Sequence, residues 1–253
     1  MKKAIVLICI LPFFCSILAQ KPDSTTTPAI FSGVITATNN GISLIPSFSL
    51  GKPALLFDLS LGKGRLSFDP MLRFGLDGKP WTFVFWWRYK LATTQKFTLS
   101  IGAHPSVVFR SVTTNSNGIS NELLTAQRYM AWEVAPTFVV NKKVSIGIYY
   151  LGSHGLTKDL AQLTTFLTLR STLSNLNLSK QLTLTLIPQV YFLKMDEREG
   201  TYLNATLVLG KKNFPLAISS IISQAIDTEI AGKKWVWNLG LTYNFHKKYV
   251  RRP

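Results

Sequence analysis

The fold is decided by the segment Pro80-Trp-Thr-Phe-Val-Phe-Trp-Trp-Arg-Tyr-Lys90. One face of this segment would carry Trp81, Phe83, Phe85, Trp87 and Tyr89. The other face would carry Thr82, Val84, Trp86, Arg88 and Lys90. Because successive side chains of a β-strand point to opposite faces, this alternation predicts a strand with one apolar face and one partly charged face.

The same alternation recurs about twelve times along the chain. The segments are 41–50, 53–61, 65–75, 80–91, 96–111, 127–140, 143–152, 162–174, 181–194, 201–209, 214–224 and 234–245. Short connections alternate with longer ones, of which 112–126 is the longest. This organisation predicts an all-β fold: an antiparallel transmembrane β-barrel of about twelve strands, with short periplasmic turns and longer external loops.

The first twenty residues have the features of a secretory signal peptide. Lys2 and Lys3 precede an apolar stretch, and Ala19 is a small residue suited to cleavage. Both cysteines lie in this stretch, so the mature chain has no disulfide and no thiolate metal site. We therefore divide the chain as follows: a signal peptide at 1–20, a lead-in or lumen segment at 21–40, the barrel at 41–245 and a basic tail at 246–253. Because Asn39-Asn40-Gly41 is a hairpin or bulge signal, Phe31–Thr38 is either an extra strand or a segment folded against the lumen.

Composition separates a membrane barrel from other basic or β-rich proteins. Apolar residues make up 47% of the chain and charged residues only 16%, and the polar strand faces carry Ser, Thr, Asn and Gly with scattered Arg. The alternative, a secreted soluble β-sandwich, would have an outer face rich in Lys and Glu. The net charge of +16 does not indicate nucleic-acid binding, because the basic residues are spread over turns, lumen and tail.

The alternation of side chains between the two faces of each strand, here called parity, places a set of charged residues inside the barrel. Its members are Arg65, Arg73, Arg88, Lys90, Arg110 and Arg170, with Asp58, Asp69 and Glu133. The excess of positive charge favours a narrow, porin-like passage for small anionic solutes, in which these side chains set selectivity. The alternative is that the charges pair across a closed interior, so that the barrel is structural or docks a partner through its external loops or basic tail.

Aromatic residues gather near both ends of the apolar faces, as expected for girdles at the two membrane interfaces. The girdle residues are Trp81, Trp87, Tyr89, Trp132, Trp235, Trp237, Tyr243 and Phe245. Five prolines lie inside the expected strands and point outward by parity: Pro46, Pro70, Pro105, Pro136 and Pro188. Since proline cannot donate a ladder hydrogen bond, we expect bulges or bends there.

The one candidate for catalysis is His104-Pro105-Ser106. This pair resembles the His-x-Ser pair of outer-membrane acyl hydrolases of the phospholipase A and lipid A deacylase types. In those families the pair faces lipid, whereas parity turns His104 and Ser106 into the lumen here. We therefore expect no enzymatic activity, and the sequence predicts neither a metal site nor a cofactor.

These features together resemble the small outer-membrane β-barrel proteins of Gram-negative bacteria. The segment Trp235-Val-Trp-Asn-Leu-Gly-Leu-Thr-Tyr-Asn-Phe245 resembles the terminal signal that the barrel-assembly machinery recognises. The resemblance implies a location in the outer membrane, contact with outer-membrane lipids and insertion by that machinery. It does not indicate a substrate.

Overall fold

The computed structural model describes residues 27–116, 119–157 and 161–249. The predicted signal peptide at 1–20 and residues 250–253 of the predicted tail lie outside this range. The strands are β1 (Ala29–Thr38), β2 (Ala54–Lys63), β3 (Leu66–Gly75), β4 (Pro80–Thr93), β5 (Phe97–Ser116), β6 (Ile119–Val139), β7 (Val144–Gly155), β8 (Leu163–Asn177), β9 (Leu182–Met195), β10 (Arg198–Lys211), β11 (Leu216–Thr228), β12 (Trp235–Trp237) and β13 (Gly240–Tyr249). In the described residues no helix is long and apolar enough to cross a membrane.

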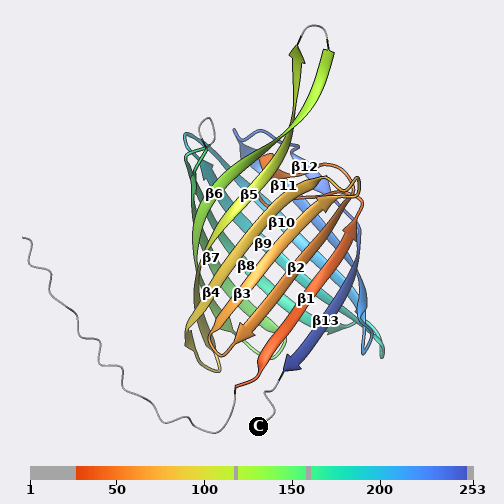
Figure 1. The fold of residues 1–253 in the computed structure, drawn as a ribbon. Coiled ribbons are helices and arrows are strands. Elements are labelled where there is room, and N and C mark those ends of the chain that lie inside the picture. The colour runs from red at the N-terminus through yellow and green to blue at the C-terminus, as the bar shows by residue number, and fades with distance from the viewer. Residues whose placement is uncertain (1–26, 117–118, 158–160, 250–253) are drawn as a thin grey trace, which may run out of the picture.

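The strands form one closed antiparallel barrel (Figure 1). Each strand from β1 to β11 pairs with the next, and β1 pairs with β13 from Ala29↔Tyr249 to Thr38↔Gly240. The short β12 and β13 are separated by two residues, and both pair with β11, so together they form a single strand of the wall. The predicted twelve-stranded barrel is therefore confirmed.

The first wall strand differs from the prediction. It is β1, within the segment expected to be a lead-in, whereas residues 41–50 form no strand and contain only the single 3-10 turn η1 (Pro46–Phe48). At the other end β13 continues to Tyr249, four residues into the predicted tail. The barrel thus begins at Ala29 and not at Gly41, because residues 29–38 supply the partner that β13 needs for closure.

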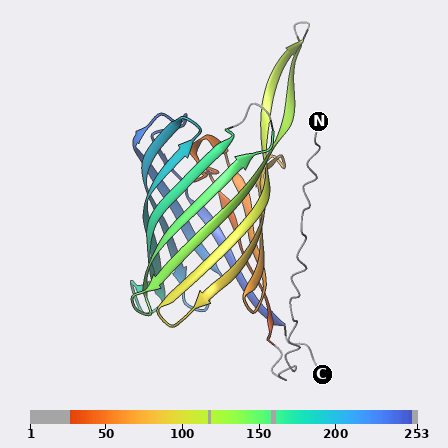
Figure 2. The same ribbon diagram turned by 90° about the vertical axis from the view of Figure 1, so that its left-hand side faces the viewer.

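The two rims of the barrel differ in their connections. Ala29, where β1 begins, and Tyr249, where β13 ends, lie at one rim, here called the terminal rim, together with short turns such as Gly64-Arg65. The opposite, distal rim carries the longer connections. The expected loop at 112–126 is instead a two-stranded ribbon formed by β5 and β6, which pair as far as Ser116↔Ile119 and project beyond the barrel (Figures 1 and 2).

Four of the five prolines mark breaks in the strand ladder. Pro70, Pro105, Pro136 and Pro188 each keep their partner on one side, while the pairing with β2, β4, β7 and β8, respectively, is interrupted there. Proline has no backbone N–H, so the neighbour on its donor side loses a partner. Pro46 differs, because it begins η1 and is not part of the wall.

The apolar outer surface carries most of the predicted girdle. Trp87, Trp132, Trp235, Trp237 and Tyr243 are each more than 40% exposed on that surface. Tyr89 is 41% exposed, and Phe245 packs beside Phe31, with 5.1 Å between ring centroids. An exposed apolar belt on a closed barrel is the surface that a lipid bilayer requires.

Trp81 is the exception among the girdle residues. Arg73 pairs with Thr82 and Phe74 with Pro80, so Trp81 is the extra residue of a β-bulge. A bulge shifts side-chain parity by one position. Trp81 therefore turns into the lumen, where it is only 2% exposed and its indole Nε1 donates to the Phe48 carbonyl at 2.8 Å.

This inversion can be tested by tryptophan fluorescence in bilayers of brominated lipid. A variant that keeps Trp87 as its single tryptophan should be strongly quenched, because that ring faces the acyl chains. A variant that keeps only Trp81 should show little quenching under the same conditions. Equal quenching of the two variants would contradict the inward position of Trp81.

Candidate functional site

The connection between β1 and β2, residues 39–53, folds into the distal half of the barrel and is called the inward segment below. Its base is closed by a hydrogen bond from the Gly41 backbone N–H to the Lys52 carbonyl at 2.9 Å. At its tip, η1 places Phe48 against Tyr129 of β6, with 5.3 Å between ring centroids. Ile45 packs against a cluster of buried apolar side chains from β8 to β11, which includes Phe166 and Tyr191.

Wall side chains satisfy the backbone carbonyls of the inward segment. The Tyr191 hydroxyl donates to the Leu44 carbonyl at 2.9 Å, and Trp81 donates to Phe48 as described above. The Arg110 guanidinium donates to the Ser47 carbonyl. A buried loop needs such partners, since an unpaired backbone carbonyl is costly away from water. Strands β4, β5 and β9 thus hold the segment from three directions.

The distal half of the lumen is packed like the core of a soluble protein. Its centre is the stack of Tyr191 on Tyr202, with 4.8 Å between ring centroids and 13° between ring planes. Ile230, from the connection between β11 and β12, joins this cluster from the distal rim. The remaining buried members are Phe166, Leu193 and Ala225.

The middle of the lumen holds a charged cluster centred on Arg88 of β4. Its guanidinium Nε lies 2.6 Å from Glu133 Oε1, and its Nη1 lies 3.0 Å from Asp69 Oδ2. Glu133 is 2% exposed and also accepts a hydrogen bond from the Tyr149 hydroxyl at 2.7 Å. Gly102 makes room for the pair, because a Cβ there would lie 3.0 Å from Glu133 Oε1. The Arg88 charge is therefore compensated by two carboxylates.

The other lumenal cations have different surroundings. Arg73 Nη2 lies 3.7 Å from Asp58 Oδ1, beyond hydrogen-bond distance. Arg170 is exposed to the lumen and lies 5.8 Å from the centre of the Tyr149 ring, with no carboxylate paired to it in the described part of the chain. Arg65 and Lys90 lie at the terminal rim, where the Arg65 guanidinium donates to the Leu91 carbonyl at 3.4 Å.

Two cavities lie on opposite sides of η1. The outer cavity, of about 440 Å³, opens toward the distal rim and is lined by Lys52, Lys79 and Arg110. The inner cavity, of about 230 Å³, lies between the inward segment and the wall formed by β3 to β8. Phe48 and Val108 line both cavities, so these two side chains form the partition between them.

The predicted His104 and Ser106 both line the inner cavity and are each 7% exposed. The His104 ring packs on Trp86, with 4.0 Å between ring centroids, and its Nδ1 has no hydrogen-bond partner. Among the described residues no hydrogen bond joins His104 to Ser106. The pair therefore lacks the contact needed for proton transfer and is enclosed away from lipid. The described residues also contain no cluster of His, Cys, Asp and Glu that could hold a metal ion.

Two exposed ion pairs lie at the distal rim, and one of them joins the β3–β4 connection to the ribbon. Lys52 Nζ lies 2.6 Å from Asp77 Oδ2, and Lys79 Nζ lies 2.6 Å from Glu122 Oε2. The hydrogen bond from Lys52 lowers the pKa of Asp77, and the hydrogen bond from Lys79 lowers the pKa of Glu122. Both carboxylates therefore stay charged at neutral pH, and these links weaken only as pH falls through the lowered pKa values.

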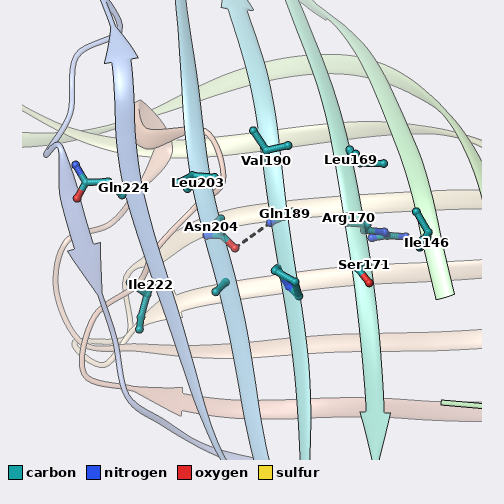
Figure 3. A pocket seen from close by; sticks show the side chains of 12 residues that line it. Ile146, Leu169, Arg170, Ser171, Gln189, Val190, Leu203, Asn204, Ile222 and Gln224 are labelled. Carbon is teal, nitrogen blue, oxygen red and sulfur yellow. Dashed lines mark hydrogen bonds between the residues drawn. The ribbon is translucent and has the colours of Figure 1, made fainter. Parts of the chain in front are cut away.

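The outer wall has a depression of about 550 Å³ beside the ladder break at Pro188 (Figure 3). Leu169, Val190 and Leu203 line it from three adjacent strands. The alternate residues of these strands belong to the lumenal face, where Gln189 Nε2 donates to Asn204 Oδ1 at 2.9 Å (Figure 3). Apolar side chains dominate the lining, as expected for a surface that lipid chains cover.

Parity correctly assigned the lumenal face of most strands but missed the inward segment and the aromatic residues that anchor it. Residues 41–50 alternate between apolar and small polar side chains and so imitate a strand. The available signal was Pro46, which fits a wall strand poorly, with Gly41 and Gly51 on either side of the apolar stretch. No comparable signal marks Trp81, because its bulge depends on pairing with β3.

No protein-family model and no curated protein matches this chain. Its structure is similar to that of a KdgM porin in complex with disordered oligogalacturonate, with a TM-score of 0.53, 9% identity and coverage of 85% of this chain and 99% of that chain. The COG4313 outer membrane channel from Pseudomonas putida F1 aligns with a TM-score of 0.48 and 12% identity, covering 88% of this chain and 96% of that one. The similarity to the KdgM porin shows that the chain shares the fold of an outer-membrane β-barrel, and the apolar outer belt is the surface that such a barrel presents to lipid.

The Arg88 cluster should contribute measurably to stability. Replacing Glu133 by Ala leaves Tyr149 and part of Arg88 without their acceptor, so we expect the free energy of unfolding to fall by about 2 kcal/mol. Urea titration of the folded barrel in detergent measures this loss. Arg170→Ala is the matched control, with an expected change of about 0.5 kcal/mol or less. Equal effects of the two substitutions would show that the cluster has no special role.

Proposed function

We propose that this barrel is a narrow passage for small anionic solutes, constricted in its distal half by the inward segment. The observation that carries this proposal is the pair of cavities in series, separated by Phe48 and Val108. Cations line both cavities, with Arg110 in the outer one and Arg73 in the inner one. A positive lining raises the local concentration of anions and lowers their barrier to entry.

The ion pairs rank the candidate selectivity residues. Arg88 is paired with two carboxylates, so it contributes little net field to the lumen. Arg73 is ion-paired with Asp58 at 3.7 Å, whereas Arg110 and Arg170 have no carboxylate paired to them among the described residues. Arg110 and Arg170 therefore carry the proposed anion preference, whereas the sequence suggested equal roles for Arg65, Arg73 and Arg88 as well.

The similar KdgM porin was solved in complex with oligogalacturonate, a chain of sugar acids. A barrel of this fold can thus accommodate an anionic chain, which supports the proposed solute class. The constriction at Phe48 and Val108 favours smaller solutes here, since these side chains narrow the route beyond the bare wall.

A second candidate is a closed barrel that docks a partner. The packed distal half favours it, as does the ribbon of β5 and β6. Pairing with β4 reaches only Val108 and pairing with β7 begins at Tyr129, so both edges of the ribbon lack a strand partner beyond those points. Such free edges are templates for added strands. Co-purification from native membranes that depends on the ribbon would favour this candidate.

Selectivity measurements in planar bilayers test the proposed passage. Arg170→Gln should reduce the anion preference of the reversal potential, because it removes an uncompensated lumenal charge. The matched control is Arg128→Gln, which removes the same charge from a residue exposed on the outer face of β6. A reversal potential that responds equally to both variants, or to neither, would argue against selectivity from the lumen.

Removal of the constriction provides an independent test. Replacing Ile42–Leu50 by a two-residue Gly-Ser linker retains the closure at Gly41 and Lys52, so the pairing of β1 with β2 should persist. We expect single-channel conductance to rise several-fold, because the distal half then lacks its filling. Unchanged conductance in a demonstrably folded variant would show that the inward segment does not limit the current.

A further inference from the structure

The inner cavity combines apolar walls with two polar side chains that each have one buried nitrogen without a hydrogen-bond partner among the described residues. Its lining includes Phe48, Trp86, Tyr129 and Phe166 as aromatic walls. The two nitrogens are Arg73 Nε and His104 Nδ1, while Arg73 Nη2 forms an ion pair with Asp58 Oδ1 at 3.7 Å. A mostly apolar pocket with a few convergent polar groups is the usual form of a small-molecule site.

The Arg73 guanidinium is the most unusual group in this lining. The Arg73 side chain is only 18% exposed, and its Nε is buried without a hydrogen-bond partner. The carboxylate of Asp58 lies too far away to accept a hydrogen bond, and Trp81 covers one side of the guanidinium at 5.6 Å from the ring centroid. Buried polar groups normally have partners, and a guanidinium has five N–H donors that suit a planar carboxylate.

His104 supplies a second orphan group in the same cavity. It is 7% exposed, so more than nine-tenths buried, and its Nδ1 has no partner. The ring is fixed edge-on against Trp86 and so cannot turn away without losing that contact. Ser106 and Thr82 add hydroxyl groups to the lining. Polar contacts to a ligand are thus available from three adjacent strands, β3, β4 and β5.

The volume limits the ligand to a single ring or a molecule of similar size. A cavity of about 150 Å³ lined by apolar side chains is large enough for benzene. The 230 Å³ found here therefore admits a ring with one or two substituents. We propose that the inner cavity is a binding site for a small aromatic carboxylate, whose ring packs among Phe48, Trp86 and Tyr129 while its carboxylate accepts hydrogen bonds from Arg73.

This site goes beyond the proposed passage and does not require conduction. A barrel that conducts no ions can still bind a carboxylate beneath η1, and a conducting barrel can lack the site. The two proposals are therefore tested by different measurements, binding at equilibrium for the site and current for the passage.

Calorimetric titration of the refolded barrel in detergent with benzoate tests the site, with detergent alone as the blank. Arg73→Gln should weaken benzoate binding at least tenfold, since it removes the charged donor. Ala131→Leu is a second variant, because it fills the cavity at a residue that is only 2% exposed without changing charge. Arg128→Gln is the control, because it removes the same charge from a residue that is exposed on the outer face of β6 and does not line this cavity.

Saturable binding that is lost in both cavity variants and retained in the control supports the site. Absence of benzoate binding to the folded parent protein overturns it. Binding that survives both cavity variants also overturns it, because the ligand then lies elsewhere. Benzyl alcohol should bind at least tenfold more weakly than benzoate, and equal binding of the two compounds would refute recognition of the carboxylate.

Discussion

Closure of the barrel by β1 and β13 is the constraint on which the rest of the interior depends. A strand in lipid has no water to satisfy its backbone, so the sheet must have no open edge. The ten pairs from Ala29↔Tyr249 to Thr38↔Gly240 meet this requirement. They also assign residues 39–53 to a connection, which contains Ile42, Leu44, Ile45 and Phe48. Exposing these side chains at the rim is unfavourable, and the lumen offers the alternative.

Folding the connection inward changes what the wall must provide. Backbone carbonyls that leave water need donors, and the wall supplies Tyr191, Trp81 and Arg110. The bulge that turns Trp81 inward belongs to this arrangement, because without it the indole would face lipid. The interior therefore has two parts: a distal part, where aromatic side chains pack around the segment together with Arg73 and Arg110, and a part nearer the terminal rim that holds Arg65 and Lys90. The Arg88 cluster lies where the two parts meet.

The sequence was sufficient for the class of fold and for most of the wall because a period of two is a local property of each strand. Features that depend on pairing were beyond it. The same alternating pattern is a strand in β4 and a folded-in connection at 41–50, and only the competition for β13 separates the two outcomes. Likewise, parity placed Arg88 and Glu133 inside but did not reveal that they are in direct contact, since β4 and β6 are joined only through β5.

The hydrogen bonds from the wall to the inward segment determine how often the segment can leave the lumen. Two neutral hydrogen bonds to backbone carbonyls contribute about 1 kcal/mol each and the Arg110 contact about 2 kcal/mol, or about 4 kcal/mol in total before apolar burial is counted. Each 1.4 kcal/mol is about a factor of ten in population, so spontaneous displacement of the whole segment is limited to roughly one molecule in a thousand. The proposed passage would then depend on small movements of Phe48 and Val108 at the partition. A side-chain rotation there costs far less than withdrawal of the segment, and it preserves the hydrogen bonds that keep the distal half closed.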